Sequence, residues 1–309
     1  MITSVFKKST PLNYSLVVIL ILVFFFMFQI KDPSWVTSYF LAFQKVSLLC
    51  FILASFFMIN FIVKKNGLSK DNGYAILFYL LFILFFPTIF NNSNIIYANF
   101  FILLALRRLI SLQSLKASKE KIFDAAFWIF VASLFQFWSI LFLILVYISI
   151  IFHVSRDYRN WVLPFIALLG VTILFYMTSL ILNFDALAFI QERAVIDFRI
   201  DYFKNNYENA ALSIYTAVAL FFVTSMLMTL SNRPQIVHSS YKKVVACFFI
   251  AVFVFIISPN KSNDLLLFSI APLSIMATSH VEYMQQKLNN EIVYYTLIVC
   301  SLFTFFSQL

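Results

Sequence analysis

The polar residues that could do chemistry lie between long apolar runs rather than inside them. Asp32 directly follows the first apolar run, and Lys261 and Asp264 lie in a short polar turn between two later runs. A carboxylate beside cations at a membrane surface could act as a general base next to a phosphate-binding group. We therefore predict Asp32 as a base and Lys261 or Arg199 as phosphate partners. The competing interpretation is that loops between apolar runs are polar because they touch water.

Two further polar residues are candidate substrate ligands. Gln136 interrupts a long apolar stretch, and Asp264 precedes another one. The sequence has no phosphate-binding loop, no dinucleotide fingerprint, no HExxH and no GxSxG, so it indicates no familiar soluble enzyme class. Cys50, Cys247 and Cys300 each lie inside an apolar run and form no CxxC pair, which predicts inert thiols, no metal site and no cofactor.

The composition determines where these residues must be placed. Of the 309 residues, 62% are hydrophobic and 11% are charged, and the mean hydropathy is +0.93. This predicts an all-α fold, a polytopic transmembrane helical bundle, with residues 1–309 in a single integral membrane domain and membrane lipids as partners. The net charge of +9 is expected from basic loops facing an anionic leaflet, so nucleic acid is not a predicted partner.

The apolar runs predict about 11 helices. They cover approximately residues 16–30, 46–63, 74–90, 95–106, two helices within 122–151, 161–182, 212–230, 244–258, 265–278 and 292–306. The fourth has only about a dozen residues, so it extends into its flanks or lies where the membrane is thin. No acidic or basic residue lies near the middle of any predicted helix, which argues against an ion-coupled transporter.

The charges around these runs predict the orientation. Of the 22 Lys and Arg residues, 16 fall on the side of Lys7 and Lys8 and 6 on the other side. By the positive-inside rule, the N-terminus is cytoplasmic and the C-terminus external. Residues 122–151 have basic residues on both flanks, which predicts two short helices with a turn near Gln136. The alternative is one long tilted helix, which would place Arg156 and Arg159 outside.

Two polar segments are amphipathic. In the predicted external loop 185–210, Leu187, Ile190, Ala194, Phe198 and Tyr202 recur at helical spacing. This segment is either a lid or guide for a lipid-linked substrate or a connector that lies flat on the membrane. On the other side, residues 107–116 are basic and amphipathic; they could contact acidic phospholipid or a partner protein, or form an ordinary positively charged loop.

Parts of the chain resemble known families. Arg107-Arg108, the segments 122–128 and 131–139, and Arg159–Pro164 resemble an uncharacterised family of polytopic membrane proteins from Bacteroidota, which implies no activity. The Ala132–Phe135 break is distantly similar to exopolysaccharide-polymerase and GT-C-type glycosyltransferase bundles. That similarity implies an acid in the first external loop, which Asp32 could match. Gln136 stands near the place where those families often carry a histidine.

These patterns together favour a multi-pass protein of a bacterial inner membrane. The leading hypothesis is a role in envelope glycan or lipid-linked sugar metabolism, with a site on the external face and a lipid-linked substrate. If that site is catalytic, the protein would be a membrane glycosyltransferase or polymerase. The alternative is a non-catalytic scaffold that binds other subunits of an envelope or secretion complex. A transporter is the third hypothesis.

Overall fold

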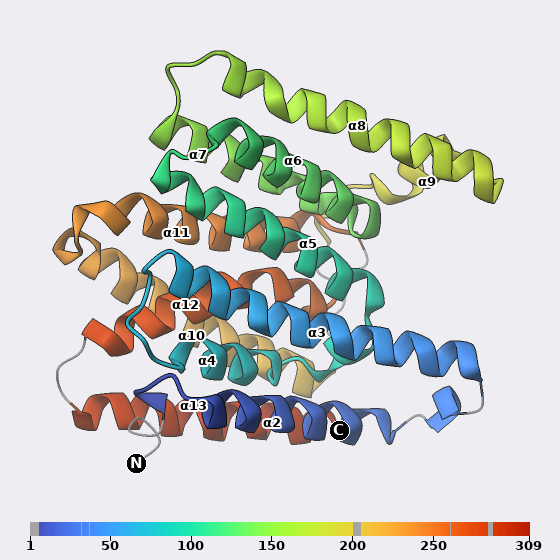
Figure 1. Ribbon diagram of the computed structural model, residues 1–309. Coiled ribbons are helices and arrows are strands. Elements are labelled where there is room, and N and C mark those ends of the chain that lie inside the picture. The colour runs from blue at the N-terminus through green and yellow to red at the C-terminus, as the bar shows by residue number, and fades with distance from the viewer. Residues whose placement is uncertain (1–5, 32, 37, 200–204, 260, 284–286) are drawn as a thin grey trace.

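The computed structural model describes residues 6–309 except 32, 37, 200–204, 260 and 284–286, and within these residues it contains helices and no strand. The described residues contain twelve α-helices, which follow one another as Figure 1 shows. They are α2 (Pro11–Gln29), α3 (Tyr39–Lys65), α4 (Tyr74–Ile83), α5 (Ser93–Ile110), α6 (Ser118–Phe135), α7 (Leu143–His153), α8 (Arg159–Leu182), α9 (Ala186–Arg193), α10 (Asn206–Thr229), α11 (Gln235–Ile257), α12 (Leu267–Tyr283) and α13 (Lys287–Gln308).

Eight helical segments in the described residues are long and apolar enough to cross a membrane. They comprise α2, α3, α5 with the 3-10 turn after it, α8, α10 with its following turn, α11, α12 with the turn before it, and most of α13. Two shorter apolar helices, Tyr74–Ile83 and Phe137–His153, accompany them. The protein is therefore an all-helical, multi-pass membrane protein. That there are about 11 crossings, and that the N-terminus is cytoplasmic, are still predictions from the sequence.

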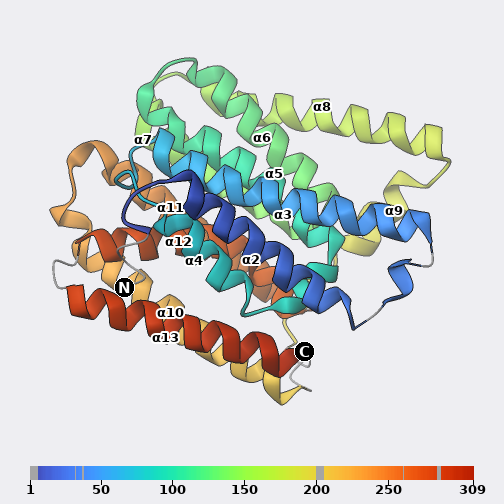
Figure 2. The same cartoon turned by 60° about the horizontal axis from the view of Figure 1, so that its bottom comes forward.

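Helices α4 and α12 form the centre of the bundle (Figure 2). All ten residues of α4 are buried, and α12 is buried from Leu267 to Val281. A helix that is apolar on every side is stable when lipid or other helices surround it, and the burial of α4 and α12 shows that here other helices do so. Aromatic rings fill the contacts between helices. The ring of Phe78 in α4 stacks on that of Tyr294 in α13 with 4.9 Å between the ring centres, and the ring centres of Phe86 and Tyr215 of α10 are 5.0 Å apart.

Two predicted helices have different lengths in the structure. The predicted helix over 74–90 ends at Ile83, and a 3-10 helix, Pro87–Asn91, follows it. Pro87 has no backbone N–H to donate to the Ile83 carbonyl and its ring crowds that carbonyl, which favours the end of the α-helix at Ile83, although α8 and α12 continue through Pro164 and Pro272. The predicted twelve-residue helix over 95–106 is in fact α5, which extends from Ser93 to Ile110. The side chain of Asn92 caps it by accepting from the Ile95 N–H.

Residues 122–151 form two helices and not one. Helix α6 ends at Phe135, Gln136 is extended with φ −130° and ψ 104°, and a 3-10 turn leads into α7. The chain reverses here, because Lys119 at the start of α6 forms an ion pair with Asp157 beyond α7 at 3.2 Å. The two basic flanks therefore meet at the same end of the bundle, and the alternative of one long helix is wrong.

Helix α8 lies at the edge of the bundle, along the top of Figure 1. It packs on α6 through a small separate core formed by Ala126, Phe130, Ala167 and Val171. Many of its other apolar side chains are exposed, among them Leu169 at 63% and Ile173 at 62%. Such a surface is suited to lipid rather than water.

The loop 185–210 contains a shorter helix than its pattern predicts. Asp185 caps α9 by accepting from the backbone N–H groups of Leu187 and Ala188, and α9 ends at Arg193. The predicted helical spacing therefore fails after Ile190: residues 194–199 are not helical, and Tyr202 lies outside the described residues. A hydrogen bond to its backbone holds this segment against the bundle instead: the indole N–H of Trp138 donates to the Val195 carbonyl at 2.9 Å.

Candidate functional site

The bundle has two chemically different ends. The basic end carries Lys64, Lys65, Arg107, Arg108 and Lys121, and the opposite end carries the turn at Gln136, helix α9 and the start of α5. At the opposite end, four separate connections surround a polar cavity of about 260 Å³. Its lining comprises Asn92, Asn94, Ile95, Phe135, Gln136, Phe137, Glu192, Arg193, Pro259, Ser262 and Leu265.

Arg193 is the cation among the residues that line this cavity. Its Nη1 donates to the Leu134 carbonyl at 2.7 Å, one of the carbonyls that the end of α6 leaves without an intrahelical partner. Its guanidinium also lies 3.8 Å from the centre of the Phe189 ring. These two contacts hold a planar charged group at the cavity wall, and a guanidinium can bind phosphate or carboxylate oxygens through two parallel hydrogen bonds.

Gln136 is fixed by the break that exposes it. Because α6 stops at Phe135, the Gln136 side chain turns toward α11, and its Nε2 donates to the Ser258 hydroxyl at 3.2 Å. Glu192 is exposed beside Arg193, so the cavity also presents a carboxylate. A guanidinium, a carboxylate and several amides around one cavity can bind a polar group that carries both an anion and hydroxyls.

An apolar cavity of about 140 Å³ adjoins the polar one. It lies between α6, α8 and α9, and its lining includes Phe130, Leu134, Leu168, Val171 and Phe189. Phe137 and Arg193 line both cavities. The site is therefore amphipathic: a polar chamber at the end of the bundle and an apolar pocket behind the lipid-facing helix α8 lie next to each other, with Phe137 and Arg193 in the wall between them.

Among the residues predicted from the sequence, Gln136 lines this site directly and Asp264 lies behind it. Asp264 is 7% exposed and accepts hydrogen bonds from the Thr88 hydroxyl and from Asn92 Nδ2, the latter at 3.1 Å. Asn92 in turn lines the polar cavity. Asp264 therefore contacts a residue of the cavity wall, and is not itself part of that wall.

Lys261 and Arg199 stabilise the loop 185–210 and do not line the cavity. The ammonium of Lys261 donates to the backbone carbonyls of Asp197 and Arg199, the latter at 3.0 Å. The Arg199 backbone N–H donates to the Asp197 carboxylate at 2.8 Å. Neither residue is among those lining the two cavities. The predicted base, Asp32, lies outside the described residues.

Sequence reasoning did not single out Glu192 and Arg193. Both lie in the loop 185–210, for which the sequence pattern predicts only an amphipathic segment. One signal could have identified them. They are an acidic and a basic residue, adjacent in sequence, at the end of the part of this loop that is both amphipathic and helical. The apolar cavity has no sequence signal of its own, because its walls combine α6 and the turn after it with α8 and α9, which come later in the chain.

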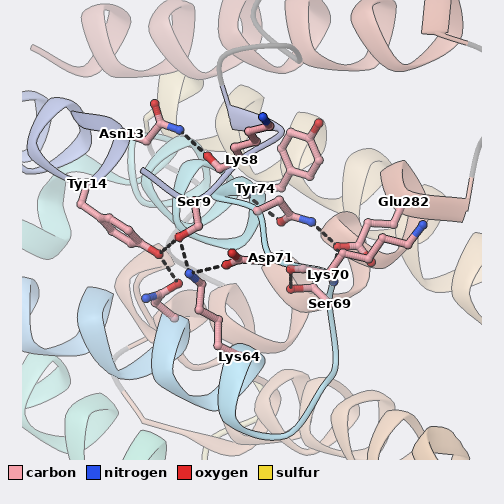
Figure 3. Close-up of polar contacts among 12 residues, drawn as sticks. Lys8, Ser9, Asn13, Tyr14, Lys64, Ser69, Lys70, Asp71, Tyr74 and Glu282 are labelled. Carbon is pink, nitrogen blue, oxygen red and sulfur yellow. Dashed lines mark hydrogen bonds and ion pairs between the residues drawn. The ribbon is translucent and has the colours of Figure 1, made fainter. Parts of the chain in front are cut away.

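The basic end holds a second polar cluster, which is internally paired (Figure 3). Lys64 contacts the Asp71 carboxylate at 2.9 Å and the Ser9 hydroxyl, and Glu282 accepts from the Lys70 backbone N–H at 3.0 Å. These bonds connect the segment before α2, the α3–α4 connection and the end of α12. The cluster fastens three chain segments together.

A buried lysine contradicts the sequence prediction that no charged residue lies near the middle of a helix. Helix α11 begins at Gln235 rather than near Val244, so Lys243 lies within it and is completely buried. Its Nζ donates to the Leu109 carbonyl at 2.6 Å and lies 3.1 Å from His153 Nε2. A buried ammonium needs such partners because it has left water.

Within the described residues, no group of three His, Cys, Asp or Glu could hold a metal ion.

Comparison with known proteins gives a family and no activity. The model of a protein family of unknown function, DUF6427, matches residues 4–309, which is nearly the whole chain. Comparison with curated proteins and with solved structures gave no match. The expected membership of an uncharacterised family is confirmed, and any function has to be argued from the site.

Proposed function

We propose that this chain, which belongs to the DUF6427 family, binds the polar head and the first part of the apolar chain of a lipid-linked, phosphate-bearing amphiphile. In the predicted orientation this occurs at the external face of a bacterial inner membrane. The role is then in envelope glycan or lipid-linked sugar metabolism.

A single observation carries the proposal: the polar cavity and the apolar cavity share Phe137 and Arg193. An amphiphile needs a polar chamber for its head, an apolar pocket for its chain and a cation near the junction for its phosphate. The polar chamber of about 260 Å³ offers room for a phosphate with a sugar-sized group. Helix α8 separates the apolar pocket from the surrounding lipid, so the chain of the ligand could enter beside it.

The same geometry supports a reaction centred on Glu192. Its carboxylate stands next to the guanidinium of Arg193 at a cavity that can admit a hydroxyl group. A carboxylate in that position could take the proton from an attacking hydroxyl while Arg193 stabilises the phosphate of the leaving group. This would be glycosyl transfer of the kind that the GT-C resemblance implies, with Glu192 in the role first expected for Asp32.

The non-catalytic alternative rests on the exposed face of α8. Leu169, Ile173 and Leu180 share one face of α8 and are 63%, 62% and 58% exposed, so this face could bind an apolar helix of another envelope subunit as well as lipid. A scaffold would use that face and would not require Glu192 or Arg193.

The test is mass spectrometry of lipid-linked glycans in a deletion strain complemented with variants. We expect the deletion to accumulate a truncated precursor, Arg193→Ala and Glu192→Gln to fail to correct it, and Lys31→Ala to correct it. Lys31 is the matched control, because it is a cation of the same end that contacts the Gln308 carbonyl and lines neither cavity.

Binding is measured separately with a photoreactive polyprenyl phosphate and the purified full-length protein. Glu192→Gln should still be labelled and Arg193→Ala should not, which separates a lost reaction from a lost ligand. An unchanged glycan profile in the deletion strain, together with equal labelling of Arg193→Ala and the wild type, would refute the proposal and favour the scaffold.

A further inference from the structure

A third cavity, of about 280 Å³, lies at the basic end between α3, α5, the turn after α5, and α6. Its lining comprises Phe61, Lys65, Asn66, Arg107, Arg108, Ser111, Gln113, Ser114 and Lys121. Four of these residues are cations and none is an acid. The cavity is at the other end of the bundle from the candidate site, so what it binds is independent of the proposed function.

Most of the positive charge in this cavity is not neutralised by an acid. Arg108 forms an ion pair with Asp124 at 2.7 Å. Lys121, in contrast, donates to neutral acceptors, the Ser111 carbonyl at 2.7 Å and the Ser114 hydroxyl at 2.8 Å. The Arg107 guanidinium lies over the Phe61 ring at 4.6 Å, and the Lys65 ammonium lies 5.8 Å from the same ring. These contacts orient the charges and leave them available to an anion.

The surface beside the cavity is apolar. Phe57, Phe61 and Lys65 follow one another at intervals of four residues on one face of α3. Phe57 is 49% exposed and Phe61 is 38% exposed. A ligand held at Lys65 and Arg107 would therefore have two aromatic rings below it, on the side that leads toward the middle of the membrane. A small inorganic ion would leave these rings uncovered, whereas an acyl chain would cover them.

We propose that this cavity is a specific site for the phosphate of an anionic phospholipid in the leaflet at the basic end. Lys65 and Arg107 bind the phosphodiester, the Ser111 and Ser114 side chains lie within the same cavity to meet the polar head, and an acyl chain lies along Phe61 and Phe57. Basic pockets between membrane helices are suited to such head groups, because low polarity around the pocket strengthens the attraction between cations and phosphate. This gives the basic segment 107–116 a bound lipid as its partner.

The test is native mass spectrometry of the full-length protein in detergent, titrated with phosphatidylglycerol, phosphatidylcholine or inorganic phosphate. We expect phosphatidylglycerol to bind the wild type more tightly than phosphatidylcholine. The double variant Lys65→Gln/Arg107→Gln should lose roughly tenfold or more in phosphatidylglycerol affinity, since each cation near an anionic head group contributes a several-fold effect. Lys65→Arg, which keeps the charge, should retain binding.

The matched control is Lys116→Gln/Arg156→Gln, which removes the same charge from the same end at residues that do not line the cavity. An equal loss of affinity in the control and the cavity variant would overturn the proposal, because it would show attraction to surface charge in general. Inorganic phosphate that displaces the lipid at millimolar concentration would also overturn it, and would make the ligand a free anion. Comparison of melting temperatures shows whether the variants are folded.

Discussion

At the scale of single residues, the partners of a side chain decide its role more than its type does. Lys261 and Arg193 are both cations near the same end of the bundle. Lys261 donates to backbone carbonyls of the loop, whereas Arg193 lines both cavities. Asp264 and Glu192 differ in the same way, since the first is buried against Thr88 and Asn92 and the second is exposed at the polar cavity.

We expect Asp264→Ala to lower the stability of the protein by about 1–3 kcal/mol, because it leaves the Thr88 hydroxyl and the Asn92 amide without their buried acceptor. Thermal unfolding in detergent measures this effect. Thr88→Val combined with Asp264→Ala should cost less than the sum of the two single changes, because the residues share one bond. If Asp264→Ala melts like the wild type and fails only to bind the photoreactive lipid, then the substrate-binding role predicted from the sequence is correct.

At the scale of helices, the packing of α8 on α6 depends on small side chains. Ala126 and Ala167 are completely buried at their contact, so the two backbones come close together there. The apolar cavity lies next to this contact, between α6, α8 and α9. The shape of the cavity therefore depends on the distance that these alanines allow.

Ala167→Leu should push α8 away from α6 and lower stability by about 1–3 kcal/mol, the usual cost of an overpacked contact. It should also reduce labelling by the photoreactive polyprenyl phosphate, because the apolar pocket changes shape. Leu169→Ala is the matched control on the same helix, since Leu169 is 63% exposed and does not line the cavity. Normal melting and normal labelling of Ala167→Leu would contradict the importance of this contact.

At the scale of the whole molecule, the connections sort into two groups at opposite ends. Helix α2 begins beside Lys64, since the Tyr14 hydroxyl bonds to Ser9 and Asn60 near that lysine, and α13 ends beside Lys31. The described chain therefore starts at the basic end and finishes at the other one, which is what the 11 predicted helices would require if each crosses the membrane. The basic cavity and the amphipathic site are consequently on opposite faces of the membrane in the predicted orientation.

Cysteine labelling in intact cells tests this orientation. In a variant with Cys50, Cys247 and Cys300 replaced by serine, we expect Gln191→Cys to react with a membrane-impermeant maleimide. Lys116→Cys should react only after the cells are opened. Gln191 is on the exposed surface of α9, and Lys116 is exposed in the connection between α5 and α6. The reverse labelling pattern would mean that the positive-inside prediction is wrong for this chain.

Composition and apolar pattern are enough to predict the class of the fold and most of the helices, because apolar runs of this length are stable only across a membrane or inside a bundle. The sequence also located the turn at Gln136, since basic residues flank the segment on both sides. Local pattern did not determine the end of α4 at Ile83, the buried Lys243 within α11 or the end of α9 at Arg193. The end of α4 does have a local signal, Pro87, but the apolar run around it predicts a longer helix. Lys243 and Arg193 depend on partners from other parts of the chain.

Only the tertiary structure decided which polar residues form a site. Gln136, Arg193 and Asn92 come from three segments separated by more than forty residues, and they meet because the ends of α5, α6 and α9 converge. Lys261 has the same charge as Arg193, but its neighbours are backbone carbonyls that it binds instead of a ligand. Spacing along the chain does not encode such convergence, because it results from the packing of whole helices against one another.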